Sequence, residues 1–336
     1  MKSLVKSSKT ILLSVFAILF VAASVFLLSA CGEKTTPSVE AKVLSYYFDE
    51  STLPTISVVT DVDGDIAWDS DQTVEAGVKS YNWTFTPKNT DAYEVVKGSI
   101  ELKNVDKYVS GQQDQTYESE IALWEDGKTY VYENCNFASS VSSTKKVDLT
   151  FINCTFNTSN TGAGGDKCIY LTSFTNLVVE GCTFGGETTE GTLSTAGYAL
   201  DLNIYSTEVD KIVIKNNKFN TTAGANADSV AISIKVRLGE TDKPTDVTGT
   251  EGSILNGVEI SGNDFADTCN TIYIGSGPKG SANANISTGA FNVSVSGNTT
   301  DVYVLERYLY PEGETAPRQL VGANSTASFG NKTSIE

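Results

Sequence analysis

The sequence LTFINCTF, from Leu149 to Phe156, is one copy of a phrase that recurs from residue 130 onward. Alternating apolar and polar residues lead into a two-residue step, Asn153-Cys154, and the copy closes on Phe. Further copies occupy 130–137, 177–184, 212–219 and 258–265, with weaker ones at 293–298 and 328–331. Recurrence on this scale is typical of a solenoid, in which a unit buries its apolar face only when a neighbour stacks on it.

Each copy predicts a strand that ends in a sharp bend. Alternation places Leu149 and Phe151 on one face of the strand and Thr150 on the other. The first step residue is Asn or Gly, and both tolerate the left-handed backbone that a bend needs. The copies are unequally spaced along the chain, which indicates coils with a fixed corner and loops of variable length.

A second family of strands is expected after the corners, at 168–171, 198–204, 230–236 and 271–274. Two strand families in a fixed order make coils of stacked sheets. From about residue 117 to the C-terminus, the chain therefore resembles the right-handed parallel β-helix superfamily that includes the pectate lyases. The resemblance implies an all-β fold with a right-handed parallel β-helix over residues 105–336.

The second step residue is Cys or Asn, and equivalent residues of adjacent coils would lie about 4.8 Å apart. Amides at that spacing hydrogen-bond in a ladder, and small buried thiols can continue it. A metal site is the alternative, and it is a poor one because the protein has no His. We expect a structural ladder of six residues, with no metal: Cys135, Cys154, Cys182, Asn217, Asn263 and Asn298.

Residues 1–30 read as a targeting segment, with three lysines ahead of an apolar run over 11–28. The run is long enough to span a bilayer, so an uncleaved membrane anchor is the alternative. The sequence LSACG at 28–32 resembles the lipobox of bacterial lipoproteins. That resemblance implies removal of a signal peptide at 1–30, lipidation of Cys31 and a tether at 31–40. The expected location is the extracytoplasmic face of a bacterial cell membrane.

The formal net charge of −17 argues against nucleic acid as a partner, because so acidic a chain repels polyanions. Solubility is the plain role of this acidity, and divalent-cation binding is a weaker alternative. Without Cys31 an odd number of cysteines remains, so they cannot all pair within one chain, and their disulfide state stays open. They are Cys135, Cys154, Cys168, Cys182 and Cys269.

Residues 41–104 form short aromatic runs broken by turn residues, which predicts a small antiparallel β domain. The run at 81–87 with Tyr93 and Gly98 resembles the Ig-like modules of bacterial surface proteins. A single copy is expected to act as a stalk, with Trp68 and Trp83 in its core and not on a sugar-stacking platform. Residues 105–120 are either a linker or a solenoid cap, and 301–310 either close the last coils or meet a partner.

The outward face of the second strand family carries the candidate contact residues. A carboxylate, an amide, cations and aromatic rings would lie across neighbouring coils there, which suits a sugar polymer but also describes an ordinary solvated face. The glycan-binding candidates are Tyr170, Asp201, Asn203, Lys235, Arg237 and Tyr273.

The function expected from these features is non-catalytic glycan binding or surface interaction, with no cofactor. The alternative is a polysaccharide lyase or glycoside hydrolase, as the pectate-lyase-like resemblance implies. A lyase of that kind would need Ca²⁺, which takes about six to eight oxygen ligands, and this face carries one carboxylate. A hydrolase would need paired carboxylates, and none stand together on a strand. No catalytic residue is assigned. The expected partners are a membrane, through Cys31, and a polysaccharide or surface protein, and the oligomeric state stays open.

Overall fold

The computed structural model describes residues 33–111, 124–137, 140–156, 167–185, 198–204, 209–220, 230–236, 255–265, 271–276, 291–298, 303–307, 319–321 and 327–329. Their regular elements are all β-strands, and most of the pairing beyond residue 106 is parallel. The all-β class and the parallel strands predicted from the recurring phrase are therefore confirmed. Cys31 and the apolar run before it lie outside the described residues.

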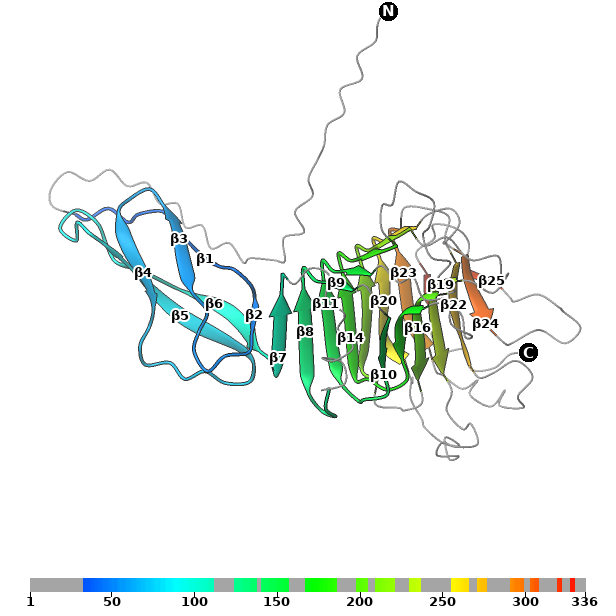
Figure 1. The fold of residues 1–336 in the computed structure, drawn as a ribbon. Helices are drawn as coiled ribbons and strands as arrows, with labels where there is room; N and C mark the ends of the chain where they lie inside the picture. The colour runs from blue at the N-terminus through cyan, green and yellow to red at the C-terminus, as the bar shows by residue number, and fades with distance from the viewer. Residues whose placement is uncertain are drawn as a thin grey trace, which may run out of the picture.

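Residues 33–104, here called the module, form two small sheets (Figure 1). A two-stranded antiparallel sheet pairs β1 (Val39–Val43) with β3 (Ile56–Thr60). A four-stranded sheet has the order β2 (Tyr47–Phe48), β6 (Val96–Asn104), β5 (Gly77–Pro87) and β4 (Gly64–Trp68). Its pairings are antiparallel except that between β2 and β6, which is parallel.

The core of the module is built from aromatic residues on β5. Tyr81, Trp83 and Phe85 are all buried, as the alternation of β5 predicts. Trp83 pairs across the ladder with Gly98, and a Cβ on Gly98 would lie 2.3 Å from the Trp83 ring. The glycine therefore makes room for the indole, and Trp83 serves as a core residue.

The first described residues are folded against the module. Thr35 bridges Tyr93, with the Thr35 N–H donating to the carbonyl of Ala92 at 2.8 Å and the Glu94 N–H donating to the carbonyl of Thr35 at 3.0 Å. The Ser38 N–H also donates to the carboxylate of Asp61 at 3.0 Å. A tether was predicted at 31–40. Within that range, the backbone of Thr35 is paired with the loop before β6.

Strands β7 to β26 form three larger sheets, here called the stack (Figure 1). The eight-stranded sheet contains β7 (Lys107–Ser110), β8 (Thr129–Glu133), β11 (Asp148–Ile152), β14 (Asn176–Glu180), β17 (Lys211–Lys215), β20 (Leu255–Ser261), β23 (Phe291–Ser296) and β26 (Ala327–Phe329). The five-stranded sheet contains β9 (Asn136–Phe137), β12 (Thr155–Phe156), β15 (Thr183–Phe184), β18 (Lys218–Phe219) and β21 (Asp264–Phe265). The seven-stranded sheet contains β10 (Val141–Ser143), β13 (Lys167–Leu171), β16 (Tyr198–Ile204), β19 (Val230–Val236), β22 (Thr271–Ser276), β24 (Tyr303–Arg307) and β25 (Gln319–Val321).

From β8 to β22, the chain visits the eight-, five- and seven-stranded sheets in that order and then repeats. The bend between the first two sheets is a residue with positive φ, such as Asn134 (55°), Asn153 (50°), Gly181 (65°), Asn216 (55°) and Gly262 (63°). These are the Asn and Gly of the recurring step. Left-handed backbone is least strained in these residue types, so the bend recurs where they stand.

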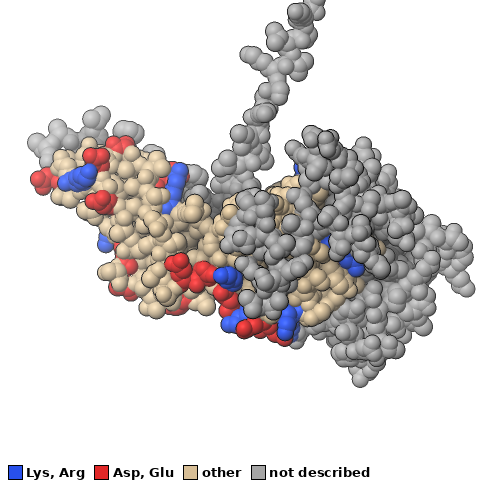
Figure 2. All heavy atoms as spheres, viewed as in Figure 1, with Lys and Arg blue, Asp and Glu red and all other residues tan. Residues whose placement is uncertain are grey.

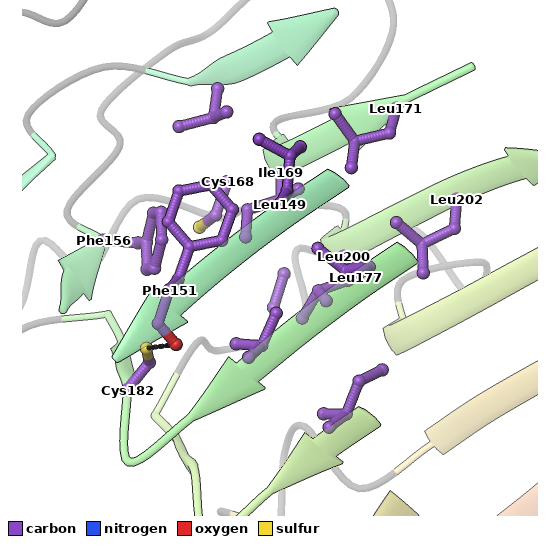
Figure 3. Close-up of a cluster of buried hydrophobic side chains, with 14 of the residues drawn as sticks. Leu149, Phe151, Phe156, Cys168, Ile169, Leu171, Leu177, Cys182, Leu200 and Leu202 are labelled. Carbon is purple, nitrogen blue, oxygen red and sulfur yellow. Dashed lines mark hydrogen bonds between the residues drawn. The ribbon is translucent and has the colours of Figure 1, made fainter. Parts of the chain in front are cut away.

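One apolar core runs through the stack (Figure 3). Leu149, Phe151 and Leu177 enter it from the eight-stranded sheet, and Ile169 and Leu200 enter it from the seven-stranded sheet. The Phe that closes each phrase stacks on the next one, in a column of five rings with centroid distances of 4.8, 4.8, 4.9 and 4.7 Å. The column consists of Phe137, Phe156, Phe184, Phe219 and Phe265.

Trp124 packs at the N-terminal end of this core. Its indole is 2% exposed and donates from Nε1 to the Tyr132 hydroxyl at 2.9 Å, while its ring lies against Tyr130. Residues 105–120 were predicted to be either a linker or a solenoid cap. In that interval, β7 adds an edge strand to the eight-stranded sheet. The aromatic side chain that covers the end of the core is Trp124, which follows this interval in the sequence.

Candidate functional site

The candidate strip lies on the seven-stranded sheet. Tyr170, Asp201, Ser233 and Tyr273 occupy the same register position on β13, β16, β19 and β22. Asn203 and Lys235 pair with each other two residues further along. Of Lys235 and Tyr273 only the backbone is described, and Arg237 lies outside the described residues. The strands thus bring the predicted positions together in register.

The burial of the strip differs from the sequence-based expectation of a solvent-exposed face. Asp201 is 0% exposed, Asn203 is 2% exposed and Ser233 is 0% exposed. A carboxylate as deeply buried as Asp201 needs charge compensation. Lys167 provides it, with Nζ 3.0 Å from Oδ2 of Asp201. Asn203 also donates from Nδ2 to Oδ1 of Asp201, at a long 3.4 Å.

Lys167 is central to the more accessible part of this site. Its Nζ lies 3.9 Å from the ring centroid of Tyr170 and 6.0 Å from that of Tyr198. Both rings are half-buried, and the Lys167 side chain is 22% exposed. We call Lys167, Tyr170, Tyr198 and Asp201 the platform. An ammonium group that lies over a ring and pairs with a buried carboxylate is stabilised by both, so the platform is preorganised.

Two platform residues, Lys167 and Tyr198, were missed from the sequence. They pair with each other at the starts of β13 and β16, just ahead of the apolar alternation that located these strands. The signal available was their equivalent position relative to Ile169 and Leu200, which are also register partners.

The six corner residues form a continuous column of hydrogen bonds. Asn217 donates from Nδ2 to Oδ1 of Asn263 at 3.0 Å, and Asn263 donates in the same way to Asn298 at 3.1 Å. Each amide also donates to a carbonyl of the preceding coil, such as that of Val179 at 2.9 Å from Asn217 Nδ2. Backbone N–H groups donate up the column, including that of Cys182 to Asn217 Oδ1 at 2.8 Å.

The thiols occupy the amide position with longer bonds. Cys154 Sγ lies 3.3 Å from the carbonyl oxygen of Tyr132, and Cys182 Sγ lies 3.5 Å from that of Phe151 (Figure 3). Tyr132, Phe151 and Val179 are register partners, so thiol and amide bond equivalent carbonyls. Burial is the main cause that raises the pKa of Cys154, which keeps this thiol protonated and unreactive.

The described residues contain no group of three His, Cys, Asp or Glu side chains placed to hold a metal ion. Nor does this part of the chain contain a helix long and apolar enough to cross a membrane. No protein-family model matches the sequence, and neither the curated proteins nor the solved structures include a match.

Proposed function

We propose that this chain is a lipid-anchored bacterial surface protein that binds a glycan on the platform and does not cleave it. In this proposal the stack is a right-handed parallel β-helix of the pectate-lyase-like kind, and the module is a small Ig-like domain. The repeated order of three sheets, with a left-handed bend in each repeat, supports the β-helix. The two small sheets around Tyr81 and Trp83 support the Ig-like domain.

The observation that carries the glycan proposal is that Lys167 Nζ lies near the rings of both Tyr170 and Tyr198. Sugar-binding sites need flat apolar rings for stacking together with fixed polar groups that orient the ligand. The platform combines two half-buried rings with an ammonium group held by Asp201 at 3.0 Å. Asp201 itself is too deeply buried to be a contact, so its role in this proposal is to position Lys167.

The same residues explain why binding is proposed and hydrolysis is not. Glycoside hydrolysis canonically divides acid and base work between two carboxyl groups. Asp201 is the single carboxylate of the platform, and it is 0% exposed and paired with Lys167. The whole sequence contains no His to replace a second carboxyl group.

The anchoring part of the proposal rests on the lipobox-like LSACG at 28–32. Lipid on Cys31 would hold the chain at the outer face of a cell membrane, because acyl chains bury well in a bilayer. Thr35, the first paired residue, follows Cys31 by four residues, so the membrane would lie near the loop before β6 to which Thr35 is bonded.

The test is binding of residues 32–336 to a panel of neutral and acidic polysaccharides, measured by calorimetry together with an assay for new reducing or unsaturated ends. We expect binding without product, and a loss of affinity of about tenfold in Tyr170→Ala or Tyr198→Ala, since a stacking contact contributes about 1–1.5 kcal/mol. Tyr46→Ala, a half-buried tyrosine of the module, is the matched control and should bind normally. Absence of binding across the panel, or unchanged affinity in both platform variants, would overturn the proposal. Product that disappears in Arg237→Ala would replace it with a lyase or hydrolase.

A further inference from the structure

The connection between module and stack has two residues, and each of them is hydrogen-bonded to a neighbouring part of the structure. β6 ends at Asn104 and β7 begins at Lys107, so Val105 and Asp106 form the whole link. Val105 is 8% exposed, and its N–H donates to the carbonyl of Phe48 at 2.9 Å. A buried, hydrogen-bonded residue has no freedom to act as a hinge.

Asp106 fastens the other end of this link to β8. Its Oδ2 accepts from the Thr129 N–H at 2.8 Å, and its Oδ1 accepts from Lys128 Nζ at 2.8 Å. Burial acts to raise the pKa of Asp106, but the bonds from Lys128 and Thr129 outweigh it and the net pKa is lowered. The ionised carboxylate is therefore the form that the link stabilises.

Glu133, at the end of β8, joins the two parts a second time. Its Oε2 accepts from the Ser45 hydroxyl of the module at 2.8 Å and from the Tyr108 hydroxyl of β7 at 2.6 Å. The Tyr108 N–H in turn donates to the Asp49 carboxylate of the module at 3.0 Å. Glu133 therefore acts as a shared acceptor for both parts.

Tyr47 lies on β2, the module strand that contacts β7 of the stack. Burial is the largest cause that raises its pKa to about 12, and Tyr46 and the carboxylates of Glu133, Asp148 and Glu180 contribute to the same shift. Those three carboxylates lie on β8, β11 and β14, so the Tyr47 hydroxyl is close enough to the eight-stranded sheet to feel its acidic side chains. Figure 2 shows acidic and basic side chains close together where the module meets the stack.

We propose that the module and the stack form one rigid body, joined by Ser45, Asp49, Val105, Asp106, Tyr108 and Glu133, so that the module is a pedestal of fixed length and direction. Thr35 pairs with Tyr93 just before β6 begins, and β6 has nine residues and ends at the link. At about 3.3 Å per residue, the paired N-terminal segment lies roughly 30 Å from the junction. A glycan site on the stack is then displayed at a set height and angle, a consequence that rests on the proposed function.

The test measures the distance distribution between two spin labels by pulsed electron paramagnetic resonance in residues 32–336. The labels go on Ser99→Cys in the module and Glu259→Cys in the stack, both of which are exposed positions, with Cys269 replaced by Ser. The four cysteines of the described residues are buried, so labelling there is disfavoured. The readout does not involve a glycan, so its failure and a failure of glycan binding are distinguishable.

We expect one narrow distance in the otherwise unchanged chain, and loss of that narrow peak in Glu133→Ala. Should Glu133→Ala fail to fold, the double variant Ser45→Ala with Tyr108→Phe removes the same two bonds from the donor side. Glu101→Gln is the matched control, because its partner Tyr46 lies within the module, and it should keep the narrow peak. A broad or double distribution in the unchanged chain would overturn the proposal, as would a narrow peak that survives in the junction variants.

Discussion

Asn217→Ala should be among the most damaging single substitutions in the stack. The Asn217 amide is 1% exposed and makes three bonds: to the N–H of Cys182, the carbonyl of Val179 and Oδ1 of Asn263. Alanine leaves the Cys182 N–H and the Val179 carbonyl without these partners in the core. Each of these two buried groups costs about 1–3 kcal/mol, so we expect a loss of about 2–6 kcal/mol in the free energy of unfolding.

The assay is equilibrium urea unfolding of residues 32–336, followed by circular dichroism at the β-sheet minimum. Asn220→Ala is the matched control, since Asn220 is half-buried and makes one long bond of 3.3 Å to the carbonyl of Gly185. That control should lose less than about 1 kcal/mol. Asn217→Cys should fall between the two, because the thiols of the column bond equivalent carbonyls at 3.3–3.5 Å. If Asn217→Ala were no less stable than Asn220→Ala, the column would not stabilise the stack and the reasoning would fail.

Two further outcomes are expected. Gly181 and Gly297 both have φ of 65°, but a Cβ on Gly181 would lie 2.3 Å from the Asn153 amide oxygen, whereas the nearest atom to one on Gly297 is at 3.8 Å. Asn153 is exposed and its amide can turn aside, so Gly181→Ala should cost at most about 1 kcal/mol more than Gly297→Ala in urea unfolding, and a larger excess would show that the Asn153 amide is fixed in place. Burial raises the pKa of Asp148, so the folded state binds this proton more tightly than the unfolded state and loses stability as pH rises through the folded pKa. Asp148→Asn should thus be stabilising at pH 7 and neutral below about pH 4, and a gain that persists in acid would refute this sign.

The recurring phrase predicted much of the stack because its information is local. Alternation around Phe151 and a left-handed residue such as Asn153 determine where a strand runs and where it bends. The equivalence of Cys182 and Asn217 was also visible, since both follow the bend residue directly. These features depend on neighbours in the sequence and on a repeat that places each copy over the last.

The parts that escaped prediction depend on contacts between distant segments. Asp201 was expected in solvent because strand alternation points it away from Ile169 and Leu200, yet it is fully buried beside Lys167. The pairing of Thr35 with Tyr93 joins residues far apart in sequence with no repeated pattern. The burial of an outward-facing residue and the docking of a terminal segment both depend on contacts with other segments of the chain, which local periodicity does not encode.

The column of five phenylalanine rings has an evolutionary consequence. Its members stand nearly parallel at 4.7–4.9 Å, so along the column each ring stacks on its neighbours in the adjacent coils. If a whole coil were deleted or duplicated, the Phe of one coil would still stack on the Phe of the next, so the core packing would be preserved. The length of this protein can therefore drift in discrete increments, each adding or subtracting a full layer, while the layers that remain keep their packing.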